Sequence, residues 1–206
     1  MADTAPLQNR CAPDGSLHAI ATRGQLMGNR GGRLHRPDRT LGAARWRTRA
    51  WIACVLDFHG RHRGVWGDGY TEIFFLDEAT ALAAGHRPCF ECRRADARAF
   101  AAAWARAAGL AAPPRAPAMD RILHAERLGP RTESIEYAAL PEGTIFAADG
   151  GFLLRTAEGV RRWSFTGYGP ARAFAADRTV TAITPAHARA ALAAGYRAQV
   201  HPSAVS

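Results

Sequence analysis

Lysine is absent from this sequence, so all 27 of its basic side chains are arginine. No apolar run approaches the about 20 residues that a membrane-spanning helix needs, which excludes a helical membrane protein. The N-terminus has neither a basic segment nor an apolar stretch, so we expect no secretory signal. Four cysteines among 206 residues are too few for a disulfide scaffold. Together these absences predict a cytoplasmic protein with reduced thiols and no membrane partner.

The arginines are unevenly placed along a chain whose net charge is +9. Ten of them fall within residues 23–63, which contain only two aspartates. Guanidinium groups match phosphate oxygens in charge and geometry, so this segment predicts a nucleic-acid partner. A solvated basic face that merely reflects codon usage is the open alternative. The expected phosphate contacts are Arg30, Arg33, Arg36 and Arg39, together with Arg87, Arg93 and Arg94 on either side of a Cys-x-x-Cys motif.

Turn residues and hydrophobic periodicity predict an α+β chain in two halves. We expect a flexible N-terminal tail at 1–22, a basic segment with a small zinc module and an alanine-rich helix at 23–110, and a second α+β half at 118–206. The proline-rich stretch 111–117 is the predicted linker. In the first half we expect strands at 51–58 and 70–75 and helices at 78–84 and 93–108. In the second half we expect a helix at 119–128, an antiparallel β-meander at 144–147, 152–156 and 160–165, and a C-terminal strand and helix ending at 194.

A short segment of the first half recurs in the second. Residues 81–87 read Ala-Leu-Ala-Ala-Gly-His-Arg, and residues 191–197 read Ala-Leu-Ala-Ala-Gly-Tyr-Arg. Both come after a predicted strand, which suggests a degenerate internal duplication of a strand–helix–turn unit. Alanine-rich helices also resemble one another by chance, so duplication and chance both stay open. A duplicated second copy would have lost its cysteines, because Gln199 and Pro202 stand where the first copy has Cys89 and Cys92.

The strongest motif is Pro88-Cys89-Phe90-Glu91-Cys92. Two thiolates separated by two residues bind one Zn²⁺ with Zn–S bonds of about 2.3 Å. A redox pair is the alternative, but such a pair usually lies between a strand and the helix that it begins. Here the cysteines come after a predicted helix and its terminal Gly85, so zinc is the favoured cofactor.

Residues 72–96, which include Glu-Ile-Phe-Phe-Leu-Asp-Glu and Gly-His-Arg-Pro-Cys-Phe-Glu-Cys-Arg, resemble the zinc-binding module of Ada, the DNA alkylation-repair regulator. The resemblance covers about residues 51–96 and implies a small zinc-bound α/β module that contacts the DNA backbone. In Ada a Cys-x-x-x-Cys pair upstream completes four thiolates, one of which accepts a methyl group. This sequence has only Cys54 there, with Phe58 four residues later. The resemblance therefore implies Cys54 as a third ligand and does not extend to methyl transfer.

A histidine is expected to complete the site, and the candidates are His35, His59, His62, His86 and His124. His124 is singled out because Asp120 lies one helical turn before it, on the same face, and can orient its imidazole. His124-Ala125-Glu126 and Pro-Cys-x-x-Cys also correspond to the two halves of the zinc deaminase signature, in reversed order. An amphipathic helix with a structural His124 accounts for the same residues.

These residues support three hypotheses. The leading one is a zinc-containing DNA-binding protein of DNA repair or processing, with zinc held by Cys89, Cys92, Cys54 and a histidine. The second is a metal-dependent hydrolase or deaminase of nucleic-acid bases, in which Cys89, Cys92 and His124 form an open zinc site, Glu126 is the general acid and base, and Asp120 assists. The third is a structural zinc protein that binds a protein partner.

Overall fold

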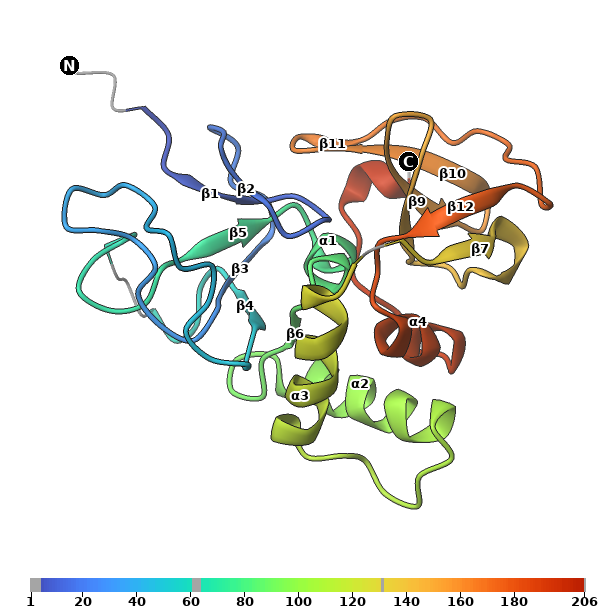
Figure 1. Ribbon diagram of the computed structural model, residues 1–206, viewed down its shortest axis with the longest axis horizontal. Helices are drawn as coiled ribbons and strands as arrows, with labels where there is room; N and C mark the ends of the chain where they lie inside the picture. The colour runs from blue at the N-terminus through green and yellow to red at the C-terminus, as the bar shows by residue number, and fades with distance from the viewer. Residues whose placement is uncertain (1–4, 61–63, 131, 206) are drawn as a thin grey trace.

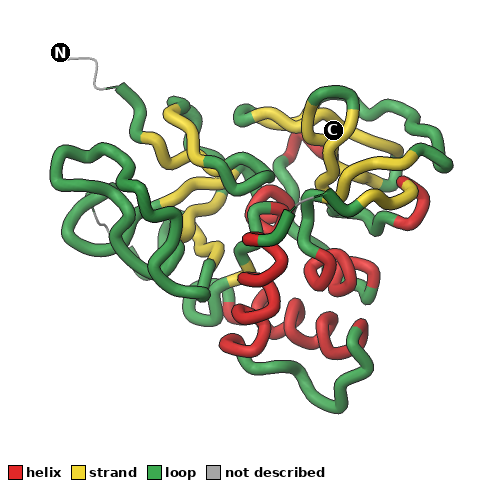
Figure 2. Tube along the Cα trace, in the orientation of Figure 1, coloured by secondary structure: helices red, strands yellow, loops and turns green. Residues whose placement is uncertain are grey.

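The computed structural model describes residues 5–60, 64–130 and 132–205. Two six-stranded sheets lie on opposite sides of the molecule, and the helices lie between and below them (Figure 1). Both sequence halves contain helices and strands, which confirms the predicted α+β class. Figure 2 shows the helices gathered in the middle of the molecule, with strands on either side.

The first sheet is mixed, with the strand order β2-β1-β5-β3-β4-β6. β1 runs parallel to β5, and β4 runs parallel to β6, while the other neighbours are antiparallel. Its strands are β1 (Gln8–Cys11), β2 (Leu17–Ala19), β3 (Leu26–Asn29), β4 (Ile52–Val55), β5 (Ile73–Phe75) and β6 (Arg87–Pro88). The flexible tail predicted at 1–22 needs correction, because residues 8–19 pair with each other and with β5.

The second sheet is antiparallel, with the order β11-β10-β9-β8-β12-β7. β8 to β11 form the predicted meander, and β12 then returns between β8 and β7. Its strands are β7 (Ser134–Glu136), β8 (Ile145–Ala148), β9 (Gly151–Thr156), β10 (Gly159–Ser164), β11 (Gly167–Tyr168) and β12 (Thr179–Ala182).

The described residues form four α-helices and two short 3-10 turns, which are α1 (Glu78–Ala83), α2 (Arg94–Ala107), α3 (Ala116–Leu128), α4 (Ala186–Ala193), η1 (Tyr137–Ala139) and η2 (Pro202–Ala204). α1 begins as predicted, because the Asp77 carboxylate accepts the Thr80 N–H at 2.9 Å. α3 begins three residues earlier than predicted. Pro117 lies in its first turn, where the missing N–H has no helical partner to lose.

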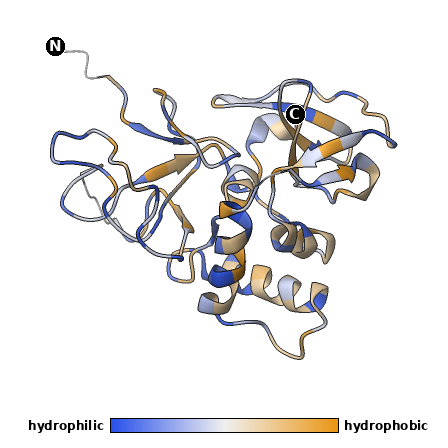
Figure 3. Ribbon diagram, viewed as in Figure 1, coloured by the Kyte–Doolittle hydropathy of each residue, from blue (hydrophilic) through white to orange (hydrophobic). Residues whose placement is uncertain are grey.

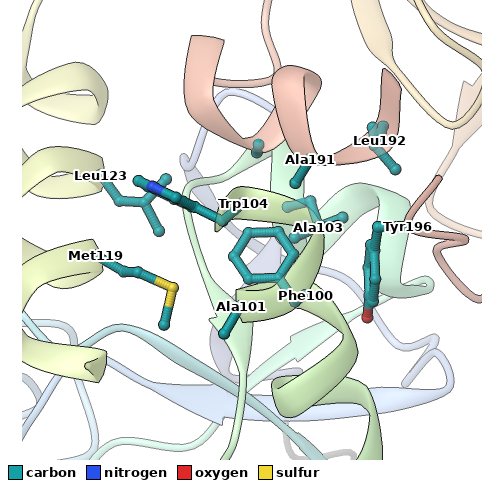
Figure 4. Packing of buried hydrophobic residues seen from close by; sticks show 11 residues of the cluster. Phe100, Ala101, Ala103, Trp104, Met119, Leu123, Ala191, Leu192 and Tyr196 are labelled. Carbon is teal, nitrogen blue, oxygen red and sulfur yellow. The ribbon is translucent and has the colours of Figure 1, made fainter. Parts of the chain in front are cut away.

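A hydrophobic cluster of α2, α3 and α4 joins the two halves (Figure 4). Phe100 and Trp104 of α2 lie between Met119 and Leu123 of α3 on one side and Leu192 of α4 on the other, and all five side chains are buried. The proline-rich linker therefore connects two halves that share this hydrophobic cluster.

Two buried carboxylates at the start of α1 also join the halves. Asp77 Oδ2 accepts hydrogen bonds from the Tyr168 hydroxyl at 2.9 Å and the His201 N–H at 3.0 Å. Glu78 Oε1 accepts the Tyr196 hydroxyl at 2.6 Å. Burial raises the pKa of Asp77 even though these donors favour its charged form. The two carboxylates thus hold the C-terminal segment against α1.

The two repeated segments end their helices in the same way. Gly85 (φ +82°) and Gly195 (φ +95°) both adopt the left-handed conformation that favours glycine. Each donates its N–H to the carbonyl three residues before it, at 2.9 Å and 3.0 Å, and the next residue bonds the carbonyl five residues before it at the same two distances. This pattern is a Schellman cap. The two units are alike in local structure, and their common origin stays a prediction.

Hydropathy matches this arrangement (Figure 3). β5 is hydrophobic, whereas the long loops on either side of β4 are mostly hydrophilic. Within the described ranges, no helix is both long enough and apolar enough to span a bilayer.

Candidate metal centre

The parallel pairing of β6 with β4 brings three cysteines together. Cys54 lies in β4, where its neighbour Ala53 pairs with Pro88 of β6. The Cys89 N–H donates to the Ala53 carbonyl at 3.0 Å, which places Cys89 beside Cys54. The next turn brings Cys92 to the same point before α2 begins. The three sulfur atoms lie within 4.8 Å of one another.

This donor set fits a thiophilic metal. Zn–S bonds of about 2.3 Å in a tetrahedral site place the sulfurs about 3.8 Å apart, so sulfurs within 4.8 Å need only a small contraction. None of the four cysteines is in a disulfide. Cys54, Cys89 and Cys92 can therefore hold a metal ion, as predicted.

Backbone N–H groups are directed at two of these sulfurs. The Glu91 and Cys92 N–H groups bond Cys89 Sγ, the first at 3.4 Å, and the Val55 N–H bonds Cys92 Sγ. Hydrogen bonds from Cys54 and Cys92 hold the pKa of Cys89 far below its ordinary value, whereas the bond to Cys89 raises the pKa of Cys54. Hydrogen bonds to a thiolate stabilise its charged form. These hydrogen bonds favour the thiolate form of Cys89, which is the form that binds metal.

The position of the motif does not by itself separate a metal site from a redox pair. Cys89 comes directly after β6 and Cys92 precedes α2, so the motif does lie between a strand and a helix, contrary to the expectation from the sequence. The third thiol favours metal, because a redox pair uses two sulfurs and a zinc site uses at least three protein donors.

The structure does not bring His124 to the thiols. In the part of the chain that is described, no histidine or carboxylate joins the three-sulfur group. His124 Nδ1 lies 2.8 Å from Arg127 Nη2, and its ring packs edge-on against Trp46. Burial and nearby arginines lower the pKa of His124. Asp120, expected to orient this histidine, instead forms a two-pronged ion pair with Arg87 at 2.8 Å.

Glu126 is also engaged away from the cysteines. Its Oε1 atom lies 2.6 Å from His187 Nδ1, and this contact ties α3 to α4. The second hypothesis placed His124, Glu126 and the cysteines in one site, and the fold separates them because α3 directs these side chains toward Trp46 and α4.

The remaining histidine candidates that the structure describes do not join the three cysteines. His35 Nδ1 lies 2.7 Å from Thr71 Oγ1, and His86 packs between the rings of Trp51 and a core phenylalanine. His59 is exposed in a turn. His62 lies outside the described residues.

Three arginines predicted to contact phosphate are buried. Arg30 is 1% exposed, and its guanidinium lies 4.0 Å from the centre of the Trp51 ring. Arg87 and Arg93 form ion pairs with buried carboxylates of α3 and α1 at 2.8 Å and 2.9 Å. A guanidinium buried in this way cannot reach a phosphate, so these three predictions are corrected.

The other predicted arginines are exposed, and most belong to one loop. Residues 30–51, between β3 and β4, form what we call the basic loop. Its exposed cationic side chains are Arg33, Arg36, Arg39, Arg45, Arg47 and Arg49. Trp46, in the middle of this series, is 39% exposed. Arg94, at the start of α2, is also exposed.

The basic loop is fastened to the loop that comes after β4. His35 and Trp66 stack with ring centres 5.2 Å apart. Thr71 Oγ1 accepts two backbone N–H groups of the basic loop at 2.7 Å and 3.1 Å, and Arg33 lies 3.4 Å from the Asp68 carboxylate. The two loops thus form one lobe beside the first sheet (Figure 1).

A cavity of about 270 Å³ opens beside the thiols on one face of the first sheet. Met27, Asn29, Ile52, Glu72 and Phe74 line it together with the three cysteines. Sequence reasoning missed this set. The one available signal is the order Glu72-Ile73-Phe74-Phe75, which places a carboxylate on one face of a strand.

Comparisons with protein-family models, with curated proteins and with solved structures gave no significant match. The resemblance to the Ada zinc module therefore stays a prediction.

Proposed function

We propose that this chain is a zinc-containing, DNA-binding protein that acts in DNA repair or processing. The observation that carries the proposal is a three-thiol cluster beside a lobe whose exposed cations are arginines. Zinc is the metal proposed because it commonly binds three or four protein ligands that include thiolates, both in fully protein-ligated structural sites and in catalytic sites with one exchangeable position. The role in repair or processing rests on the resemblance of residues 51–96 to the Ada zinc module.

DNA binding is assigned to the basic loop. Its six exposed arginines offer charge to the phosphate backbone, and Trp46 offers a ring on which a base can stack. The metal stabilises the neighbouring β4–β6 pair, since it joins Cys54 to the turn after β6. The metal module and the lobe are then two parts of one surface.

The test is the salt dependence of DNA binding, measured by fluorescence anisotropy with single- and double-stranded oligonucleotides. Replacing Arg36, Arg39 and Arg49 by Gln removes three exposed charges and spares Arg33, which bonds Asp68. The slope of log affinity against log salt should become shallower by about 2.7 on duplex DNA. The matched control replaces Arg98, Arg121 and Arg197, which are exposed elsewhere, and should leave the slope unchanged.

Equal slopes for both triple variants would contradict the assignment of the basic loop. Stoichiometric metal without any DNA binding would contradict the DNA proposal and favour a structural zinc protein with a protein partner.

A further inference from the structure

The cavity beside the thiols is built by strand alternation. β3, β4 and β5 direct Leu26, Ala53 and Phe75 toward the core beneath α1. Their alternate residues face the other way, and Met27, Cys54 and Phe74 line the cavity in one row across the three strands. One face of the first sheet is therefore core, and the other is a pocket with a metal-binding residue in its wall.

The metal would have a coordination position open to this pocket. Tetrahedral zinc takes four ligands, and three is the number that the described residues supply. All three cysteines line the cavity, so a molecule bound there lies next to the metal. Zinc with three protein ligands and one exchangeable position is the arrangement found in catalytic rather than structural sites.

Glu72 faces the same cavity from the opposite side. Its side chain is buried, and Oε2 accepts the Trp66 N–H at 2.8 Å, which fixes the carboxylate. No described residue donates a hydrogen bond to Oε1, so one carboxylate oxygen is left to accept N–H groups of a ligand. Met27, Ile52 and Phe74 supply apolar parts of the remaining wall, and its polar parts come from Arg23, Asn29, Tyr70 and Glu91.

The dimensions suit one ring system. Glu72 directly precedes β5, two strands from β4, so the carboxylate and thiol walls are about 10 Å apart at the backbone. A cavity of about 270 Å³ lies at the lower end of small-molecule sites. We propose that it binds one amine-bearing nitrogen heterocycle of nucleobase size, with a ring nitrogen toward the metal and its N–H groups on Glu72. This inference rests on the metal of the proposed function.

The test uses the protein with Co²⁺ in place of Zn²⁺, because Co²⁺ absorbs in the visible and reports its ligands. Imidazole, which needs only the open metal position, should shift the spectrum. Cytosine should also shift it, and calorimetry on the zinc protein should give its affinity. Glu72→Gln keeps an acceptor for the Trp66 N–H but loses the charge, and should weaken cytosine about tenfold without changing the imidazole shift.

Two further variants show whether the cavity itself holds the ring. Ile52→Phe narrows the cavity and should abolish cytosine binding while metal content stays at one per chain. Glu126→Gln is the matched control and should change neither probe, because Glu126 bonds His187. An oligonucleotide with one cytosine is compared with the same strand carrying an abasic position in its place, to distinguish a base within a strand from a free base. If strands are the natural source, the cytosine strand should shift the spectrum and the abasic strand should not.

The possible results separate this inference from the proposed function. A chain that binds no metal overturns both this inference and the metal part of the proposed function. If the protein binds metal but imidazole does not shift the spectrum, this inference alone is overturned. The same holds if imidazole shifts the spectrum but cytosine does not bind, or if Glu72→Gln leaves cytosine affinity unchanged. DNA affinity that depends on the basic loop is unaffected by either of these results.

Discussion

The two repeated strand–helix–glycine units fold alike locally and differ in the segment after the glycine. After Gly85 the chain enters β6, which pairs with β4 and delivers Cys89 beside Cys54. After Gly195 no strand forms before the end of the described chain. The segment bonds the start of α1 instead, where the Gln199 N–H donates to Glu78 at 2.9 Å. The metal site therefore depends on a neighbouring parallel strand and not on the helix and its cap.

Because the segments after the two glycines differ, the two units also have different roles in the structure. The first unit holds the three-thiol cluster at one face of a sheet. The segment after the glycine of the second unit supplies N–H and O–H donors to the buried carboxylates at the start of α1. Changes in the first unit after its glycine should abolish metal binding, whereas equivalent changes in the second should leave it intact.

The largest expected effect is therefore on metal content. Cys89→Ser should lose stoichiometric zinc on dialysis, because a serine hydroxyl does not replace a thiolate and only two thiols remain. Gln199→Ser changes the corresponding residue of the second unit, whose backbone alone bonds Glu78. Elemental analysis should give one zinc per chain for this control, and equal zinc in both variants would refute the site.

Stability should respond next most strongly at Asp77. Asp77→Asn places an amide where the Tyr168 hydroxyl and His201 N–H need an acceptor, which should cost about 3 kcal/mol in urea unfolding. His187 is the corresponding residue of the second unit, and its bond to Glu126 is partly exposed. His187→Ala should cost about 1 kcal/mol or less. A larger loss of unfolding free energy for His187→Ala than for Asp77→Asn would contradict the conclusion that the buried Asp77 carboxylate is the stronger link between the two halves.

The two cap glycines give a matched pair. Each Ala variant must hold a left-handed residue, which costs about 1 kcal/mol. A Cβ at Gly85 would also lie 2.8 Å from Arg127 Cδ, whereas one at Gly195 meets nothing closer than 3.8 Å. Gly85→Ala should therefore cost about 3 kcal/mol and Gly195→Ala about 1 kcal/mol in thermal or urea unfolding. Equal costs would show that the Gly85 contact relaxes freely.

The smallest effect concerns an exposed charge cluster of the second sheet. Hydrogen bonds from Arg178 and Arg172 hold the pKa of Asp149 at about 2. Because this pKa lies below the unfolded value, the carboxylate stabilises the fold above about pH 4, and the contribution is lost as the pH falls through 2. Asp149→Asn should lower the urea midpoint slightly at pH 6 and less at pH 3. An Asp149 pKa near 4 in a carbon-detected NMR titration would refute the pairing.

Local signals predicted much of the fold. The Asp77 cap, the glycines after α1 and α4, and the alternating segments of the meander all act over a few residues, and the structure places those elements close to their predicted bounds. The N-terminal strands were missed because Gln-Asn-Arg-Cys in β1 has no β-branched residue and is held by pairing with the distant β5.

The candidate site was predictable only in part for the same reason. Cys-x-x-Cys spacing indicates two ligands, and the Ada resemblance supplied Cys54. Residue spacing placed His124 on one face of a helix, but it could not indicate that the His124 ring packs against Trp46. Arg30 gave no sign of burial, because its partner Trp51 is 21 residues away in the sequence, directly before β4. Glu72 was overlooked because the pocket appears only when three strands are assembled.

The most direct test of the central claim is X-ray absorption at the zinc edge of the purified protein. We predict one zinc per chain with three sulfur neighbours at about 2.3 Å and one nitrogen or oxygen neighbour at about 2.0 Å. A chain without zinc, or zinc with two sulfur neighbours or fewer, would contradict it.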